Sequence, residues 1–331
     1  MALDPTPSTD WAERPSSAEA ARHQEFSDGI SRLQTGLNRK YGPGRAFHRQ
    51  QVAGLAGELR VTATEPELRQ GLFAEDGPWP VRVRLSHGGI APHADAIPDI
   101  QGFAISVRDI DGPGALADTT DRQDFLLINM PAFGFRSSEE FAQVALSRGP
   151  VGLAKDLIAA KGPVAGPVEL ARLTSSVLRP FTGFATTDFH SAAPIRFGPY
   201  AVKVRLVPVD ASRNLTALVD QHGDIAGRLA SGPLTYDLQV QFFVSEDVTP
   251  IEDMRDPWPQ DRSPFHPVAR LTLPRQDLDS EAGRELADEI ERDQFDPWNA
   301  LADHRPLGEV MRARKVAYYP SVRNRSAPDP E

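Results

Sequence analysis

Two histidines and an aspartate lie close together in the segment HGGIAPHAD, residues 87–95. Imidazole nitrogens and carboxylate oxygens are common ligands of zinc and related ions, so His87, His93 and Asp95 are candidates for a metal site. The segment is rich in glycine and proline, however, and a solvated loop is the more frequent structure for such a sequence. We therefore expect a loop here and no metal site.

A second unusual segment lies near the C-terminus, where residues 312–325 read RARKVAYYPSVRNR. Tyr318 and Tyr319 lie between two pairs of arginines. Taken alone, this segment is typical of a last helix with a solvated basic face and two aromatic side chains packed against the body. The sequence has no GxSxG nucleophile motif, no phosphate-binding loop, no HExxH motif and no dinucleotide-binding glycine motif. Phosphate-binding and zinc-hydrolase functions therefore have little support.

The composition argues against several classes of protein. The chain of 331 residues has a formal net charge of −10 and 40% hydrophobic residues. An acidic chain is a poor partner for nucleic acids and anionic membranes, and no apolar run approaches the ~20 residues that span a bilayer. The absence of cysteine excludes disulfides, thiolate nucleophiles and iron–sulfur clusters. The N-terminus shows no secretory signal, so we expect a cytoplasmic enzyme or binding protein.

The elements that must position functional residues follow from the spacing of apolar residues, glycines and prolines. A helical N-terminal arm is expected within residues 1–43. Short apolar or alternating runs then predict strands over 44–275, with a helical insertion at about 137–192. Helices are expected again over 276–325, before a tail at 326–331. Since the strands do not alternate regularly with helices, we expect one domain of the α+β class: an antiparallel β-barrel with helices packed outside it.

Three polar residues lie in or beside the predicted strands. His48 precedes the small-residue strand QVAGLAGELRV, Arg84 lies near the end of the strand WPVRVRLSHG, and Asn129 lies in the apolar run DFLLINMPAFGF. Individually they are typical of a capped loop histidine, a charge at a strand end and a turn former before Pro131. In this order, and with the motifs around them, they resemble the haem-binding core of the catalase family.

Five short motifs carry the resemblance. The family pattern is R-x-x-H, R-F-S, D-P-R-G-F-A, N-N-T-P-x-F-F with a downstream Phe, and R-x-x-x-Y. The corresponding segments here are RAFH at 45–48, RLS at 84–86, DIQGFA at 99–104, INMPAF at 128–133 with Phe141, and RKVAY at 314–318. They keep the order of the family, and the resemblance extends from about Arg45 to Arg325.

The resemblance implies a haem b cofactor in a barrel-based pocket, with an iron ligand from the last helix. Tyr318 would be that ligand, and Arg314, one helical turn earlier, would be the cation that favours its phenolate form. Tyr319 is the alternative ligand, because it directly precedes a proline as the family's tyrosine does. The other cofactor contacts that the resemblance implies are propionate-binding arginines and ring-packing phenylalanines: Arg45, Arg84, Arg325 or Arg323, Phe133 and Phe141.

The resemblance also implies a catalytic group on the distal side of the haem. His48 would take a proton from one peroxide oxygen and deliver it to the other, and Ser86 would bond the imidazole and fix its tautomer. The distal asparagine of the family motif aligns with Ile128, so Asn129 fills that catalytic role only if the strand is shifted by one residue. A second departure from the family is Gln101, which stands in place of an arginine.

We favour a haem peroxidase that uses hydrogen peroxide or organic hydroperoxides to oxidise a small donor. Peroxide disproportionation needs a narrow channel and a distal asparagine, whereas this chain is short and has Ile128 at the aligned position. The alternatives are a true catalase, a hydroperoxide isomerase or allene oxide synthase-like enzyme, and a haem-binding or haem-free barrel module. The expected partners are a peroxide and a small electron donor, and a homodimer is one assembly that the sequence allows.

Overall fold

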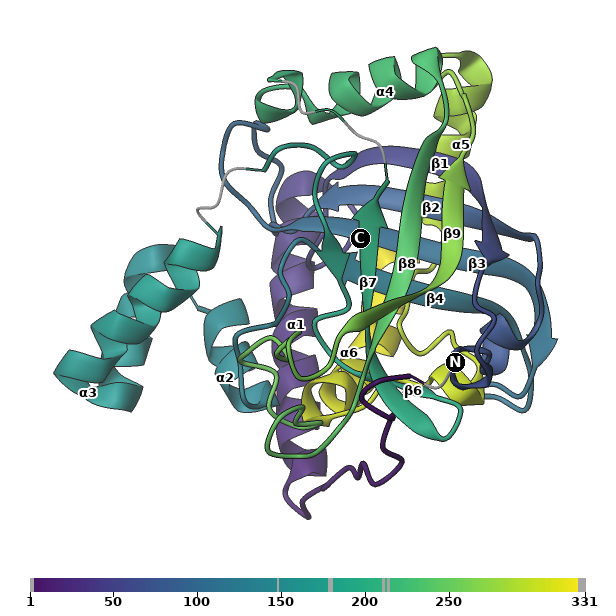
Figure 1. The fold of residues 1–331 in the computed structure, drawn as a ribbon. Coiled ribbons are helices and arrows are strands. Elements are labelled where there is room, and N and C mark those ends of the chain that lie inside the picture. Colours follow the sequence, from purple (N-terminus) through teal and green to yellow (C-terminus); the bar gives the residue numbers. More distant parts are fainter. Residues whose placement is uncertain (1–2, 148, 178–180, 210–211, 213–214, 327–331) are drawn as a thin grey trace.

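The computed structural model describes residues 3–147, 149–177, 181–209, 212 and 215–326, and its centre is a closed antiparallel β-barrel (Figure 1). Neighbouring strands follow the order β4, β3, β2, β1, β9, β8, β7, and β5 closes the ring by pairing with both β4 and β7. A short strand, β6, extends the sheet beyond β7. The strands are β1 (Gln51–Val61), β2 (Trp79–His87), β3 (Gln101–Gly112), β4 (Thr120–Ile128), β5 (Phe189–His190), β6 (Ile195–Phe197), β7 (Tyr200–Pro208), β8 (Leu234–Phe242) and β9 (Phe265–Leu273).

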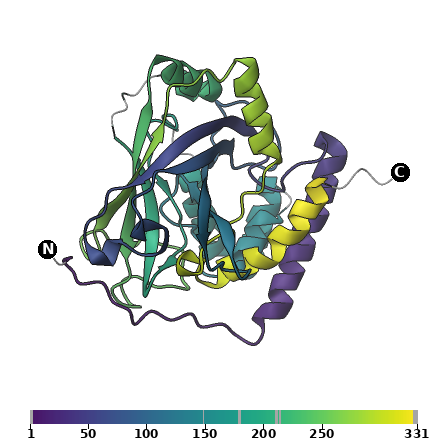
Figure 2. The ribbon, with the colours of Figure 1, turned by 90° about the vertical axis from the view of Figure 1, so that its right-hand side faces the viewer.

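The helices pack outside the barrel. They are α1 (Glu19–Tyr41), α2 (Ser138–Ala145), α3 (Gly149–Val177), α4 (Gln221–Ser231), α5 (Glu281–Arg292) and α6 (Glu309–Ser326). The first and last helices, α1 and α6, lie side by side (Figure 2), and α3 projects away from the barrel (Figure 1). Short 3-10 turns η1 (Pro66–Leu68), η2 (Gly71–Ala74), η3 (Thr216–Leu218) and η4 (Ala302–His304) lie in the connections. In the described part of the chain, every helix is too short or too polar to cross a membrane.

Apolar side chains fill the interior of the barrel. In β2, for example, Val81, Val83 and Leu85 belong to the main hydrophobic core and are almost completely buried. Successive residues of a strand point to opposite faces, so Arg84 and Ser86 lie on the outer wall. The candidate site is therefore on the outside of the barrel, where helices cover the wall, and not in its interior.

The position of α6 is fixed by hydrogen bonds from α1. Pro320 lies inside α6 and has no N–H, so the carbonyl of Val316 lacks its usual helical donor. The hydroxyl of Ser27 in α1 donates to this carbonyl over 3.1 Å. Further along, the side-chain amide of Gln34 donates to the carbonyl of Ser321 over 3.0 Å. These bonds set the register of α6 along α1.

Ion pairs hold the start of the same helix. Arg312 pairs with Glu13 (2.7 Å), with Glu19 at the start of α1 (2.8 Å) and with Glu252 (3.1 Å). Although burial opposes the charged form, hydrogen bonds to these carboxylates raise the pKa of Arg312 above its ordinary value. The helix that carries the tyrosines is thus anchored near both ends.

The α+β fold with an antiparallel barrel is confirmed. The arm expected within 1–43 contains α1, and the insertion expected at about 137–192 contains α2 and α3. The strand expected in DFLLINMPAFGF ends earlier than predicted, at Ile128. Asn129 still donates to the carbonyl of Gln101, but Pro131 has no N–H to continue the ladder. Of the predicted tail, residues 327–331 lie outside the described residues.

Candidate functional site

The candidate catalytic histidine, His48, lies against three neighbouring strand positions on the outer wall of the barrel. Ser86 of β2 pairs with Gly102 of β3, and Gly102 pairs with Ile128 of β4, so these three positions share one face of the sheet. His48 lies just before β1, and its Nδ1 is 3.1 Å from Ser86 Oγ. Its φ of 51° lies in the left-handed region, which is uncommon for a residue other than glycine. The predicted contact between His48 and Ser86 is therefore present.

Gly102 leaves the space that the imidazole occupies. A Cβ atom at this position would lie 2.6 Å from His48 Nδ1 and 2.8 Å from Ser86 Oγ. Any larger residue would have to displace one of the two side chains. The glycine of the DIQGFA motif thus permits the close approach of His48 to the barrel wall.

Asn129 lies beyond this ladder and faces the backbone of β3. Its N–H donates to the carbonyl of Gln101 over 3.1 Å, and its side-chain Oδ1 accepts from the Gln101 N–H over 2.8 Å. The register of β4 is not shifted, so Ile128 and not Asn129 shares the face of Ser86. The distal role predicted for Asn129 required that shift, and this arrangement does not support it.

Three arginines converge on Glu291, near the C-terminal end of α5. Arg84 Nε donates to Glu291 Oε2 over 2.8 Å, and Arg45 forms an ion pair with the other carboxylate oxygen. Arg325 Nη1 lies 3.5 Å from the main-chain carbonyl of Glu291. Burial, followed by the charge of Arg84, lowers the pKa of Arg45 to about 9. The next carboxylate, Asp293, pairs with Arg108 and Arg122, so Arg45 and Arg84 share the single carboxylate of Glu291.

The close packing of α5 on β1 brings Glu291 to these arginines. A Cβ atom at Gly54 of β1 would lie 2.7 Å from the Cα atom of Ala287, so only glycine allows this approach. The side-chain amide of Gln51 also donates to the carbonyl of Ala287 over 2.9 Å. Glu291 was not among the predicted site residues, because the sequence EAGRELADEIER is typical of a solvated helix and nothing in it marks this carboxylate.

Arg314 and Tyr318 of α6 form the predicted pair. Arg314 Nη2 donates to Tyr318 Oη over 2.6 Å, as the i, i+4 spacing on one helical face allows. The guanidinium also lies 5.7 Å from the ring centre of Phe133. The side chain of Tyr319 lies outside the described residues, so the choice between the two tyrosines as ligand stays a prediction.

The segment of His48 and helix α6 belong to one packed unit. They share a hydrophobic cluster that includes Ala46, Phe47, Phe141, Ala313 and Ala317. Two of these residues directly precede His48, and two others directly precede Arg314 and Tyr318. Burial, then the charge of Arg84 and to a smaller extent that of Arg314, lowers the pKa of His48 to about 4. The imidazole is therefore neutral at pH 7 and lies within electrostatic range of the arginine of α6.

Two clefts lie elsewhere on the outer wall. The first, of about 830 Å³, is bounded by β1, β2, β3 and α5 and includes Arg82, Arg108 and Arg292 in its lining. The second, of about 720 Å³, also includes Arg292 in its lining. Neither is lined by His48 or Tyr318. These two clefts are therefore separate from the candidate site around His48 and Tyr318.

Comparison with solved structures identifies the fold. The chain superposes on a fungal catalase with a TM-score of 0.68 at 19% sequence identity, over 89% of this chain and 62% of that one. Catalase A from Saccharomyces cerevisiae gives 0.66 at 18% identity, over 88% and 62%, and a bacterial catalase gives 0.65 at 20%, over 98% and 64%. The chain has the catalase fold. No protein-family model and no curated protein sequence matches it.

The chain spans less than two thirds of the length of each of the three catalases. The structure brings three groups of predicted site residues together. His48 contacts Ser86, and Arg314 contacts Tyr318 and Phe133. Arg45 lies near Arg84 and Arg325. Asn129 is instead bonded to the backbone of Gln101.

Proposed function

We propose that this protein is a haem-dependent peroxidase, which reduces hydrogen peroxide or organic hydroperoxides and oxidises a small donor. The observation that carries the proposal is that the segment leading to His48 shares one hydrophobic cluster with the helix of the Arg314–Tyr318 pair, in a chain with the catalase fold. A barrel that served only as a scaffold would not need a buried basic cluster, a neutral histidine and a phenol–guanidinium pair in one unit.

The residues present fit a haem b group. Tyr318 offers a phenol oxygen to a ferric ion, and Arg314, already bonded to that oxygen, favours the phenolate form. Arg45 and Arg84 share one carboxylate and Arg325 lies beside them, so these guanidinium groups would pair with the two carboxylates of the haem propionates. We assign Phe133 and Phe141 to packing against the ring, because Phe133 contacts Arg314 and Phe141 lies in the shared cluster.

A bound haem would supply the redox chemistry for cleavage of the O–O bond, and the residues of this chain would bind the peroxide and move its proton. Ser86 Oγ accepts the Nδ1 proton of His48, so that Nε2 presents its lone pair to the peroxide. Nε2 would take the proton from one peroxide oxygen and return it to the other, which departs as water or an alcohol. Two donor molecules then supply the two electrons and two protons that complete the reduction.

We propose peroxidase over catalase activity because of Ile128. Oxygen release requires a second peroxide to be held beside the first, and a hydrogen-bonding side chain on the face of Ser86 would hold it. Ile128 occupies that face and offers no hydrogen bond. Asn129 does not share that face, because the register places Ile128 opposite Gly102, and its Oδ1 is bonded to the N–H of Gln101 on β3.

The experiment that tests this choice compares oxygen release with donor oxidation. We expect slow oxygen release from hydrogen peroxide, and oxidation of a phenolic donor with tert-butyl or cumene hydroperoxide. Ile128→Asn is expected to raise oxygen release, by roughly tenfold if one hydrogen bond to the second peroxide is gained. Leu126→Asn is the matched control, since Leu126 lies on the same face of β4 but opposite Ala104. Rapid oxygen evolution by the unmodified protein, without any reaction of organic hydroperoxides, would make it a true catalase.

Gly102→Ala tests the placement of the imidazole. The added methyl group must displace His48 or Ser86, and we expect the rate of reaction with peroxide to fall by roughly 100-fold, with the circular dichroism spectrum unchanged. Gly227→Ala in α4 is the control, because a Cβ atom there meets no atom within 4 Å. A Gly102→Ala protein that reacts at the original rate would show that the reaction does not depend on this contact.

A further inference from the structure

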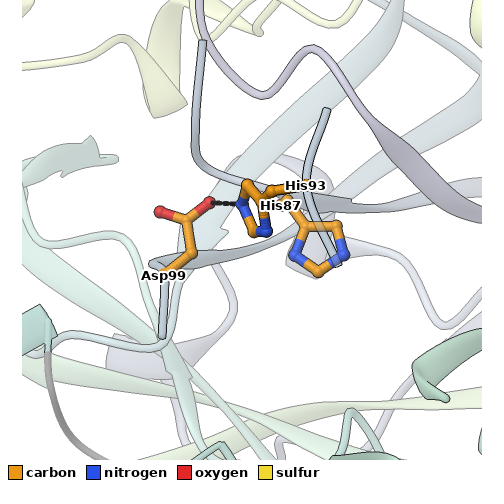
Figure 3. Close-up of side chains that lie close together, drawn as sticks. All are labelled: His87, His93 and Asp99. Carbon is orange, nitrogen blue, oxygen red and sulfur yellow. Dashed lines mark hydrogen bonds and ion pairs between the residues drawn. The ribbon is translucent and has the colours of Figure 1, made fainter. Parts of the chain in front are cut away.

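Two histidines and an aspartate lie close together where β2 ends and the connection to β3 follows: His87, His93 and Asp99 (Figure 3). One ligand atom each of His87, His93 and Asp99 lies within 4.8 Å of the others. The sequence predicted a solvated loop here, but His87 is completely buried and the side chain of His93 is only 17% exposed. These side chains, whose types can ligate a metal ion, are therefore packed together inside the protein and are not solvated.

The hydrogen bonds of His93 direct one nitrogen toward Asp99. Its Nδ1 lies 3.0 Å from the carbonyl oxygen of Ala94, which can only accept, so Nδ1 carries a proton. Its Nε2 lies 3.0 Å from Asp99 Oδ2. The lone pair of Nε2 and the carboxylate oxygen can be this close only with a proton or a metal ion to share. Metal-binding histidines have this arrangement, with the second nitrogen bonded to a protein oxygen.

His87 is placed in the same way. Its Nε2 lies 2.9 Å from Asp95 Oδ1, and its Nδ1 lies 3.3 Å from the side-chain amide of Gln101. Gln101 is only 1% exposed, and its Oε1 has no hydrogen-bond partner. A half-turn of the amide group exchanges its oxygen and nitrogen, so that Oε1 accepts from Nδ1–H of His87. The Nε2 atom of His87 is then available to a metal ion beside Asp95.

We propose that His87, His93, Asp95 and Asp99 bind one divalent transition-metal ion, for which Zn²⁺ is the best match. Two neutral imidazoles and two carboxylates balance its charge and supply the four nitrogen and oxygen ligands of a tetrahedral site. Ligand atoms at about 2.0–2.1 Å from zinc lie about 3.3 Å from one another, close to the distances within each His–Asp pair. The ligand atoms of His87, His93 and Asp99 lie within 4.8 Å of one another and must approach by up to roughly 1.5 Å on binding, while Asp95 must move in together with His87.

An ion at this position would tie the loop to the segment that carries His48. The carbonyl of Gly88 accepts from the N–H of His48 over 3.1 Å. Asp99 Oδ2 also accepts from the N–H of Gly89 over 2.7 Å, and the N–H of His93 donates to Gln50 Oε1 over 2.9 Å. The proposed metal site would therefore hold in place the backbone to which the N–H of His48 is bonded. The site does not depend on whether the protein binds haem.

Zinc binding by the full-length protein tests the proposal. After treatment with EDTA, the protein is dialysed against ZnCl₂ and bound zinc is measured by elemental analysis. We expect about one zinc per chain, and a loss of at least about 100-fold in affinity in His93→Gln, which removes a ligand. His222→Gln is the matched control: His222 also pairs with a carboxylate, Asp279 (3.1 Å), but belongs to no such cluster in the described residues. It is expected to bind zinc like the unmodified protein.

Thermal unfolding gives a second measurement. Added zinc is expected to raise the unfolding midpoint of the unmodified protein and of His222→Gln, but not that of His93→Gln. Absence of stoichiometric zinc in the unmodified protein, or the same affinity in all three proteins, would overturn the site. Haem content is measured in parallel, because its loss would bear on the proposed peroxidase function and not on the zinc site.

Discussion

Replacing Tyr318 by phenylalanine is expected to give a folded protein with little or no bound haem. A phenyl ring has no oxygen to ligate iron, and Arg314 would lose the partner to which it now donates over 2.6 Å. Packing of α6 should persist, because α1 holds this helix through the carbonyls of Val316 and Ser321. Haem per chain, from the absorption spectrum after reconstitution with haemin, is the measurement.

Tyr319→Phe is the control for this prediction. It changes the neighbouring phenol and is expected to leave haem content nearly unchanged. If Tyr319→Phe loses haem and Tyr318→Phe retains it, the ligand is Tyr319. The contact of Arg314 with Tyr318 would then not serve to ligate haem.

His48→Ala is expected to retain haem and to slow the reaction with peroxide by roughly 100-fold to 10,000-fold, the range for loss of a general acid–base group. Because burial and Arg84 lower the pKa of His48 to about 4, its imidazole can accept a proton at neutral pH. We expect the rate for the unmodified protein to fall as the pH is lowered through about 4, where the imidazole becomes charged. Stopped-flow measurement of the haem spectrum against pH checks both expectations.

The control for the distal histidine is again His222→Gln, which removes an imidazole whose partners are the carbonyl of Val52 and the carboxylate of Asp279. It should react with peroxide at the original rate and with the original pH profile. Full reactivity of His48→Ala would remove His48 from the mechanism.

Features that depend on local spacing could be predicted from the sequence. Arg314 and Tyr318 are four residues apart on one helix, so their contact needs only that the helix forms. The strands of the barrel follow from alternating apolar residues such as Val81, Val83 and Leu85, which fill its interior. The contact between His48 and Ser86 was implied by the family resemblance, and the structure places the two side chains 3.1 Å apart.

Features that depend on tertiary packing could not be predicted. Whether Asn129 or Ile128 shares the face of Ser86 depends on the register of β4, since a shift of one residue exchanges the two faces of a strand. Glu291 reaches Arg84 only because Gly54 lets α5 approach β1, and no local pattern marks that approach. The contact of His93 with Asp99 depends on how the loop closes, which its glycines and prolines do not specify.

Haem binding by the purified full-length protein tests the central claim most directly. We predict that haemin titration gives about one haem per chain, with the absorption spectrum of ferric haem ligated by a phenolate, and that Tyr318→Phe abolishes this spectrum. A protein that binds no haem in this titration, or whose haem spectrum is the same in Tyr318→Phe and Tyr319→Phe as in the unmodified protein, would contradict it.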